Sequence, residues 1–294
     1  MSRTERSMSA VFSPIRLGRN RVRFNAPHLG GAKVSRVFGG QIASQIVQAV
    51  KLVNHNCLVL TVKVNFVAPG HTAQPIEVHV EMIPESDFAV AHVFQEERQI
   101  ATSKIRFGDA NDLLSESVYS MNGVKSPLSH EPHEKHLKTI EEHHPWQFLN
   151  LLVKNGFFEI RPVDIRHITS QPMDRKALQV WCKIGKVYRN DEEVANIDGV
   201  SIVIMISDYL VAVAAHINLL TYHQEHEFGI GASLNHMVTF HELNDVDPMG
   251  WYLYNSSCEI HSNNRYMIDA QIFDVRGRCI LSSVQEGYMS RAEI

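Results

Sequence analysis

The sequence predicts an α+β fold in which one helix, followed by a run of antiparallel strands, occurs twice along the 294-residue chain. Two observations carry this prediction. In each half, an apolar segment of helical length precedes several segments in which apolar and polar residues alternate, the pattern of half-buried strands. A polar, histidine-rich run lies between the halves. We therefore expect two copies of one structural unit, joined by a linker.

The first copy begins with a helical pattern at residues 38–53. The apolar residues of this segment fall on one helical stripe: Ile42, Ile46, Ala49, Val50 and Val53. The period then changes to two at residues 62–68 and 76–82, which predicts strands. Two more strands are predicted near residues 88–95 and 100–107, and the short reversal between them fits a hairpin.

Residues 108–156 interrupt the pattern with a polar, proline-containing run, which we predict to be a linker with one short helix. Its histidines, in residues 130–136 and 141–144, raise a metal-site hypothesis. No cysteine and no regular ligand spacing accompanies them, so a solvated connector is the preferred interpretation. We therefore predict no metal site and no cofactor.

The second copy repeats the order of the first. Strands are predicted at residues 157–163 and 178–185, before an apolar helix at residues 200–215. The strands predicted after this helix are residues 237–241, 251–261, 266–274 and 279–289. A helix that is apolar nearly all round must be covered on several sides, and an antiparallel sheet does this by curling around it. We expect the two sheets to join along their edges, which removes exposed edge strands.

Predicted boundaries follow from these patterns. Residues 1–20 form a flexible basic tail, residues 21–107 the first unit, residues 108–156 the linker and residues 157–294 the second unit. The arginine-rich start resembles an organelle transit peptide, although a disordered basic tail has the same composition. Arg21-Val22 and His28-Leu29 match the spacing of an amino-terminal peroxisomal signal, but this match overlaps a predicted strand.

The composition limits the classes of partner. Hydrophobic residues make up 44% of the chain and charged residues 20%, which suits a globular protein with a proper core. The net charge of -4 gives no overall basic field, so nucleic acid is not an expected partner. The four cysteines are far apart and lack metal-ligand spacing, which indicates reduced core thiols: Cys57, Cys182, Cys258 and Cys279. No apolar signal-peptide core follows Met1, so an intracellular compartment is favoured.

Asp208 is the leading candidate for a functional residue. It interrupts the longest apolar stretch in the chain, residues 200–215. A buried carboxylate is costly unless hydrogen bonds or an opposite charge compensate it, and such a group often marks a functional site. Two alternatives compete: a capped, solvated position at a helix end, and a membrane span, which an aspartate at the centre and the lack of a second span disfavour.

Several motifs together resemble the thioesterase II family, which consists of acyl-CoA thioesterases with a double hotdog fold. The motifs are Val37-Phe38-Gly39-Gly40-Gln41, Ser207-Asp208, the strand from Asn235-His236 to Phe240-His241, and Val284-Gln285-Glu286-Gly287. The resemblance covers roughly residues 22 to 290, and the order and spacing of the motifs make it specific. It implies two helices, each wrapped by an antiparallel sheet, with the two sheets joined into one curved sheet.

The resemblance also implies a site. In that family an Asp, a Thr or Ser and a Gln activate the water that hydrolyses the thioester, and these positions correspond to Asp208, Ser233 and Gln285 in this chain. Gln285 is chemically suitable because its amide both donates and accepts, although an outward-facing glutamine would only be a surface residue. Ser233 is not expected to be a nucleophile, because no G-x-S-x-G elbow surrounds it.

Three further residues are candidate substrate contacts: Gly40, Gln41 and His236. The Gly39-Gly40 pair at a helix start exposes backbone amides that could bind an oxyanion, but close packing of helix and strand explains the glycines equally well. For His236, a structural hydrogen bond is the alternative to a substrate contact.

The chain departs from the family pattern at three positions where arginine is usual: Ala68, Ala91 and Glu242. Losing cations matters because arginine side chains bind phosphate groups well, and CoA carries several. Two other functions therefore stay open. One is a non-catalytic hotdog protein that binds acyl-CoA or only oligomerises. The other is a hotdog enoyl-CoA hydratase that uses Asp87 and His92, although their odd separation in a strand places them on opposite faces.

The resemblance implies acyl-CoA as substrate, a homodimer and the peroxisomal matrix. The carboxyl-terminal residues Arg291-Ala292-Glu293-Ile294 are not a peroxisomal address of the Ser-Lys-Leu type, so cytoplasmic and mitochondrial locations stay open.

Overall fold

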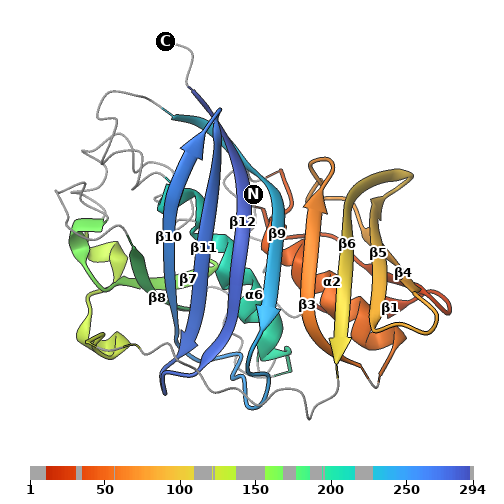
Figure 1. Cartoon of the computed structure of the whole chain (residues 1–294), viewed down its shortest axis with the longest axis horizontal. Coiled ribbons are helices and arrows are strands. Elements are labelled where there is room, and N and C mark those ends of the chain that lie inside the picture. Colours follow the sequence, from red (N-terminus) through yellow and green to blue (C-terminus); the bar gives the residue numbers. More distant parts are fainter. Residues whose placement is uncertain are drawn as a thin grey trace, which may run out of the picture.

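Among the residues that the structure describes, twelve strands form one antiparallel sheet, which is the frame of the protein in the computed structural model (Figure 1). The structure describes residues 11–30, 35–55, 57–108, 121, 123–136, 156–167, 177–185, 194, 196–215 and 228–291. The strand order is β1-β2-β4-β5-β6-β3-β9-β12-β11-β10-β8-β7. The predicted α+β class and the joining of the two sheets into one, both expected of a double hotdog, are confirmed.

The first half of the sheet packs on helix α2, Gly39–Val53. Its strands are β1 (Ile15–Arg16), β2 (Arg21–Phe24), β3 (Leu58–Phe66), β4 (Ile76–Met82), β5 (Phe88–Gln95) and β6 (Arg98–Gly108). Inward-facing residues of β2 to β6 are buried, as the period of two predicts, and they cover the apolar stripe of α2. The residues of the possible amino-terminal peroxisomal signal lie in this folded region, because Arg21 and Val22 belong to β2 and His28 and Leu29 are buried.

The second half packs on helix α6, Gly199–Tyr209, every residue of which is buried. Its strands are β7 (Phe158–Pro162), β8 (Leu178–Ile184), β9 (Phe228–Phe240), β10 (Tyr252–Ser262), β11 (Arg265–Asp274) and β12 (Cys279–Arg291). Helix α6 begins where the carboxylate of Asp198 accepts a hydrogen bond from the amide of Val200 at 3.0 Å, the usual way to cap a helix start. It ends at Tyr209, and after a turn at Leu210 residues 211–215 are helical again, so the predicted helix of residues 200–215 is interrupted rather than continuous.

The two halves are built in the same order and meet at the middle of the sheet. In each half the first strand after the helix lies at the seam, and the last strand lies beside it: β3 with β6, and β9 with β12. At the seam, β3 and β9 pair antiparallel from Thr61 opposite Thr239 to Asn65 opposite Asn235. The sheet is therefore continuous across the duplication.

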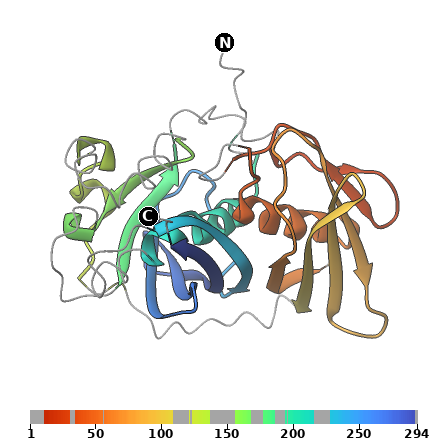
Figure 2. The same ribbon diagram turned by 90° about the horizontal axis from the view of Figure 1, so that it is seen from above.

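Both helices lie on the same side of the curved sheet (Figure 2) and run antiparallel to each other. Their direction follows from contacts at the two ends: Gly40 meets Asp208 at one end, and Lys51 meets Asp198 at the other. Within the described residues, no helix is long and apolar enough to cross a membrane. The strongly apolar character of α6 is explained by its burial between α2 and the sheet.

The predicted linker is partly packed rather than fully solvated. Its described residues include two 3-10 helices, η2 (Pro127–Ser129) and η3 (His133–His136), and Pro127 and His133 are buried. The indole of Trp181 in β8 donates to the carbonyl of Lys125 at 3.1 Å. A small apolar cluster forms there, on the opposite side of the sheet from the helices: Trp181, Leu253, Phe273 and Cys279, with Met121, Val124, Val163 and Trp251 against it. Residues 141–144 lie outside the described residues.

Candidate functional site

Asp208 lies in the last turn of α6, and its side chain is almost fully buried, with 7% of its surface exposed. Its two carboxylate oxygens have different partners. Oδ2 accepts the backbone N–H of Gly40 at 2.6 Å, and Oδ1 accepts hydrogen bonds from the hydroxyl of Ser233 at 3.3 Å and from Nε2 of Gln285. Such hydrogen bonds compensate the cost of burying a charge. The position at a helix end was one of the alternatives, but the carboxylate is not solvated.

The start of α2 supplies one hydrogen bond to this carboxylate and, in addition, the positive end of the helix dipole. Gly40 is the second residue of α2, so its N–H belongs to the unpaired amides at the positive end of the helix dipole. A carboxylate placed there gains favourable electrostatic energy. The first half of the chain therefore stabilises the charge of a residue from the second half.

The two glycines are required by close packing. A Cβ atom on Gly39 would lie 2.9 Å from Oδ2 of Asp208 and 3.0 Å from the ring of Phe66. A Cβ atom on Gly40 would lie 3.0 Å from Cβ of Asp208 and 3.1 Å from the backbone Cα of Met205. Close packing and hydrogen bonding thus occur together, and the Gly40 amide points at Asp208 rather than at an open oxyanion position.

Ser233 and Gln285 come from neighbouring strands, β9 and β12. Gln285 lies opposite His236, and Ser233 lies opposite Gly287, with a register shift between these pairs that brings Ser233 toward the helix side. Nε2 of Gln285 donates to Oγ of Ser233 at 2.6 Å as well as to Asp208, so both of its amide hydrogens are used. The three predicted side chains Asp208, Ser233 and Gln285 therefore converge.

The glutamine also presents an acceptor. Oε1 of Gln285 is buried and has no hydrogen-bond partner among the described residues. Buried acceptors are normally satisfied by protein or water, so this atom can receive a hydrogen bond from a water molecule or a ligand in the site. The amide orientation follows from the network, because Nε2 must be the atom that faces the carboxylate.

His236 lies next to the trio and is fully buried in β9. Its Nε2 is 3.1 Å from Oγ of Ser207, the residue before Asp208 in α6. Burial lowers the pKa of His236 from its usual value, and the negative charge of Asp208 acts in the opposite direction. Ser207 was recognised only as part of the Ser207-Asp208 motif, and no sequence pattern indicated that it would contact His236.

Gln41 is not brought to the trio by any contact in the structure. Its Oε1 accepts the backbone N–H of Leu29 at 2.8 Å, and its Nε2 is 2.8 Å from Nδ1 of His28. Burial lowers the pKa of His28 to about 4, so this ring is neutral and its Nδ1 can accept from the amide. Gln41 therefore fastens the loop at residues 28–29 to the start of α2, and its expected contact with substrate stays a prediction.

Two tyrosines of the second half lie close enough to Asp208 for its negative charge to affect their pKa values. Burial raises the pKa values of Tyr254 and Tyr266 far above their usual range, and the carboxylate of Asp208 raises them further. The ring of Tyr266 fills the space over Gly287, where a Cβ atom would lie 2.0 Å from it. Sequence reasoning missed both residues, because an alternating strand pattern does not show which inward side chains reach a given helix residue.

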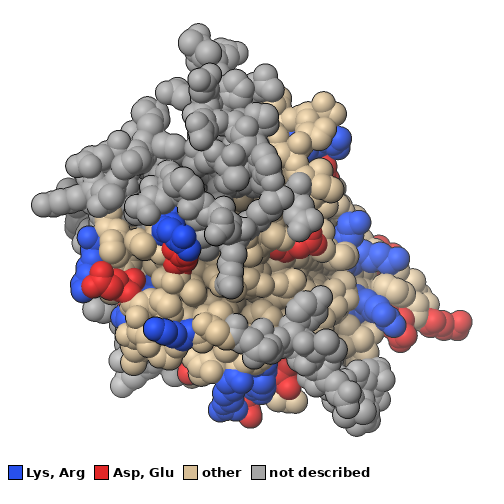
Figure 3. Space-filling view, turned by 60° about the vertical axis from the view of Figure 1, so that its left-hand side comes forward, with Lys and Arg blue, Asp and Glu red and all other residues tan. Residues whose placement is uncertain are grey.

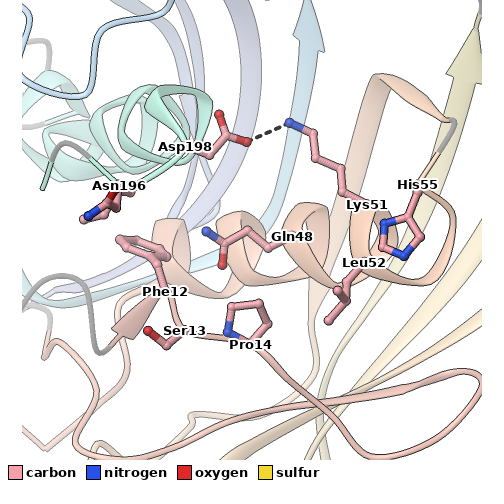
Figure 4. Close-up of a pocket in the computed structure, with 10 residues that line it drawn as sticks. Phe12, Ser13, Pro14, Gln48, Lys51, Leu52, His55, Asn196 and Asp198 are labelled. Atoms are coloured by element: carbon pink, nitrogen blue, oxygen red, sulfur yellow. Dashed lines mark hydrogen bonds and ion pairs between the residues drawn. The ribbon is translucent and has the colours of Figure 1, made fainter. Parts of the chain in front are cut away.

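A cavity of about 380 Å³ lies at the opposite end of the helix pair from Asp208 (Figure 4). It is lined by the end of α2, the residues before α6 and the amino-terminal segment Phe12, Ser13 and Pro14, and the ion pair of Lys51 with Asp198 spans it at 2.7 Å. Gln48, another lining residue, lies nine residues after the first residue of α2, as Asp208 does in α6. Its Nε2 donates to Oγ of Ser201 at 3.1 Å.

The duplicated position thus holds a neutral amide where the second helix holds a carboxylate. Gln48 faces the start of α6 just as Asp208 faces the start of α2. A neutral amide is a far poorer proton acceptor than a carboxylate. At the other end of the helix pair, the position equivalent to Asp208 therefore lacks a carboxylate that could act as a general base.

The residues of the possible hydratase pair do not form a site. Asp87 is exposed just before β5, and His92 is half-buried within β5, where Nδ1 lies 3.2 Å from Nε2 of Gln99. Neither residue has a contact with the Asp208 network. Among the residues that the structure describes, no group of three or more His, Cys, Asp or Glu side chains could hold a metal ion.

Two of the positions that lack the usual arginines, Ala91 and Glu242, lie in different surroundings. Ala91 is fully buried in β5, so an arginine there would enter the core. Glu242 follows β9, and its Oε1 accepts the backbone N–H of Asn244 at 2.9 Å. On the face shown in Figure 3, the described Lys and Arg side chains lie among Asp and Glu and form no continuous basic surface.

Comparison with known proteins identifies the family. Residues 30–102 match the family model of the acyl-CoA thioesterase N-terminal domain, and residues 134–289 match that of the C-terminal domain. No match to a curated protein was found. The fold is similar to that of a putative thioesterase II from Thermobifida fusca, with a TM-score of 0.75 and 13% identity over 99% of this chain and 100% of that one.

Two other solved structures share the fold. Acyl-CoA thioesterase II TesB2 from Mycobacterium marinum has a TM-score of 0.70 and 18% identity, over 98% of this chain and 99% of that chain. The dehydratase domain of PpsC from Mycobacterium tuberculosis, in complex with C12:1-CoA, has a TM-score of 0.56 and 8% identity, over 98% of this chain and 100% of that chain. At these identities the structures show the fold, whereas the two domain matches show the family. The chain belongs to the acyl-CoA thioesterase family and is a thioester hydrolase.

Proposed function

We propose that the protein hydrolyses acyl-CoA to a free fatty acid and CoA with a water molecule activated by Asp208, Ser233 and Gln285. The observation that carries this proposal is the convergence of the three side chains, contributed by α6, β9 and β12, on one buried carboxylate. Their hydrogen bonds join segments 25 and 77 residues apart in sequence. Such a constellation of a base and two orienting groups fits general-base hydrolysis.

The chemistry requires no covalent intermediate. A thiol with a pKa near 8.5 leaves as thiolate without prior protonation, so a thioester needs only an activated water and a polarised carbonyl. Asp208 accepts a proton from the water molecule as the water oxygen attacks the carbonyl carbon of the thioester. Oε1 of Gln285, which has no partner among the described residues, accepts a hydrogen bond from the second O–H of the water and so orients it. The hydroxyl of Ser233 holds the carboxylate and the amide in place.

The charge of Asp208 is held ready for this role by the start of α2. The Gly40 amide occupies Oδ2, which leaves Oδ1 as the oxygen that faces Ser233 and Gln285. Proton transfer at Oδ1 then occurs in a water-poor surrounding, where electrostatic interactions are stronger than in bulk water. The reacting carbonyl of the substrate would then lie beside Oδ1 of Asp208.

The test replaces Asp208 with asparagine and measures thiol release from palmitoyl-CoA. Asn cannot accept a proton at this site, so kcat should fall by about 10²- to 10⁴-fold, the usual contribution of a general base. The matched control is Asp198→Asn, the same change at the other end of the same helix, where asparagine is an equally good helix cap. The control should keep its turnover. Wild-type turnover in Asp208→Asn with an intact fold contradicts the assignment.

A non-catalytic acyl-CoA-binding protein is distinguished by the wild-type chain alone. Such a protein would gain thermal stability with palmitoyl-CoA but release no thiol.

We also propose, from the resemblance, that the chain forms a homodimer and acts in the peroxisomal matrix. Light scattering after size-exclusion chromatography and imaging of the tagged full chain test these two points.

A further inference from the structure

The contact between Ser207 and His236 defines a second link between α6 and β9, beside the link through Asp208 and Ser233. The two helix residues are adjacent, and the two strand residues are three apart. One hydrogen bond leaves a helix free to rotate against a strand, whereas two bonds at different points fix both its rotation and its position along the strand. The second link therefore bears directly on where Asp208 points.

The hydrogen-bond donor in this link follows from the partners of Ser207. A serine hydroxyl has one proton, and Oγ of Ser207 lies only 2.7 Å from the carbonyl of Ile204, to which it donates. In the 3.1 Å contact, Oγ of Ser207 must then be the acceptor and Nε2 of His236 the donor, so Nε2 carries the proton. Nδ1 of His236 has no partner among the described residues, and a proton there would leave a buried N–H without an acceptor.

His236 also touches the other side of the trio. It lies directly opposite Gln285 in the pairing of β9 with β12, and both side chains are buried on the helix side of the sheet. Directly opposed residues on one face of a sheet have Cβ atoms about 5 Å apart, so their side chains pack together. The ring is thus bonded to the residue before Asp208 and packed against Gln285.

We propose that His236 is a positioning residue of the hydrolytic site, which uses its neutral, Nε2-protonated ring to set Asp208 against Ser233 and Gln285. This inference rests on the proposed function of that trio. His236 acts through Ser207 and through the packing of Gln285, and it does not contact the thioester. The substrate contact expected from the sequence is therefore replaced by a role in geometry.

The experiment compares two neutral replacements that differ in reach. In His236→Gln, the side-chain amide can place an N–H close to the position of Nε2, whereas in His236→Asn the amide ends near the position of Nδ1 and is too short to reach Ser207. Because small misplacements of catalytic groups cost up to about 100-fold, His236→Asn should lose about tenfold or more in kcat. KM for palmitoyl-CoA should stay within about twofold, and His236→Gln should recover most of kcat.

Ser207→Ala removes the other partner with a small change of volume, and it keeps the test decisive if a histidine variant folds poorly. It should lower kcat with KM unchanged, and adding His236→Asn to it should cause little further loss, because both changes break the same link. The control is His241→Asn, just after β9, since His241 bonds Ser282 at 2.9 Å on the opposite side of β12 from Gln285. Its turnover should match that of the wild type.

Several outcomes would overturn the proposal. Wild-type kcat in His236→Asn and Ser207→Ala, a loss of kcat no larger than the loss of folded protein, or equal defects in His236→Gln and His236→Asn would each do so. A change confined to KM would instead indicate a substrate contact. Failure here is separable from failure of the proposed function, because Asp208→Asn can be inactive while His236→Asn is fully active.

Discussion

Adding a single methyl group at Gly40 is expected to separate the two helices at the site. In Gly40→Ala, the new Cβ would lie 2.9 Å from the ring of Phe38, 3.0 Å from Cβ of Asp208 and 3.1 Å from the backbone of Met205. The Phe38 ring can turn away, but the Met205 backbone can move only with α6. An ordinary contact needs at least 3.4 Å, so the gap must widen by a few tenths of an ångström.

The size of the effect follows from two opposing terms. Overpacking of this kind typically costs about 1–3 kcal/mol of unfolding free energy. Alanine is favoured over glycine within a helix by up to about 1 kcal/mol, and by less in the first turn. The packing term is the larger, so Gly40→Ala should destabilise the protein by about 1–2 kcal/mol. Because the Gly40 N–H moves away from Oδ2 of Asp208, turnover should fall as well.

The assay is urea unfolding followed by fluorescence, together with kcat for thiol release from palmitoyl-CoA. The control is Gly18→Ala, since no atom lies within 4 Å of a Cβ at Gly18 and its substitution should leave both quantities unchanged. A Gly40→Ala protein as stable and as active as the wild type would refute the reasoning that close approach of α2 and α6 builds the site.

Three other changes are expected to have specific results. Ser233→Thr should keep turnover because the hydroxyl remains, and Ser233→Ala should retain a reduced but measurable kcat; complete inactivity of Ser233→Ala would indicate a nucleophile instead. Burial lowers the pKa of His28 to about 4, from a value near 6.5 in the unfolded chain. Between pH 6.5 and pH 4 the unfolded chain therefore binds more protons than the folded one. The unfolding free energy should drop by up to about 3 kcal/mol as the pH falls through this range. His28→Gln should show a weaker drop in urea titrations at pH 7, 5 and 4, and an unchanged slope would argue against this cause. Gln48→Leu, at the far end of the helix pair, should leave kcat within about twofold of wild type, and a large loss of kcat would contradict a single hydrolytic end.

The architecture could be predicted because its signals are local. Alternation along residues 76–82 predicts strand β4 with its observed bounds, and the helical stripe beginning at Ile42 predicts α2. The prediction for β9 began at residue 237, whereas the strand begins at Phe228. Glycines at 229 and 231 weaken a strand pattern, and pairing with β12 overrides that weakness.

The site was predictable in part. Asp208 could be singled out by its charge in an apolar segment, and Ser233 and Gln285 entered through the family resemblance rather than through any local pattern. Their contact depends on the register of β9 with β12 and on the shift near Gly287, which a single sequence does not encode in readable form. The same holds for Ser207 with His236, and for Gln41, whose bonds to the residues at 28–29 link segments twelve residues apart or more.

The seam between β3 and β9 has a consequence for how the protein behaves on dilution. Gly40 and Asp208, which complete the site together, are parts of one covalent chain, and the pairing of Val62 with Val238 joins their sheets without an encounter between molecules. If the two units were separate polypeptides, their association would follow mass action and weaken at low concentration. Fusion replaces that equilibrium with a high effective concentration, so these paired elements stay assembled even where the protein is scarce.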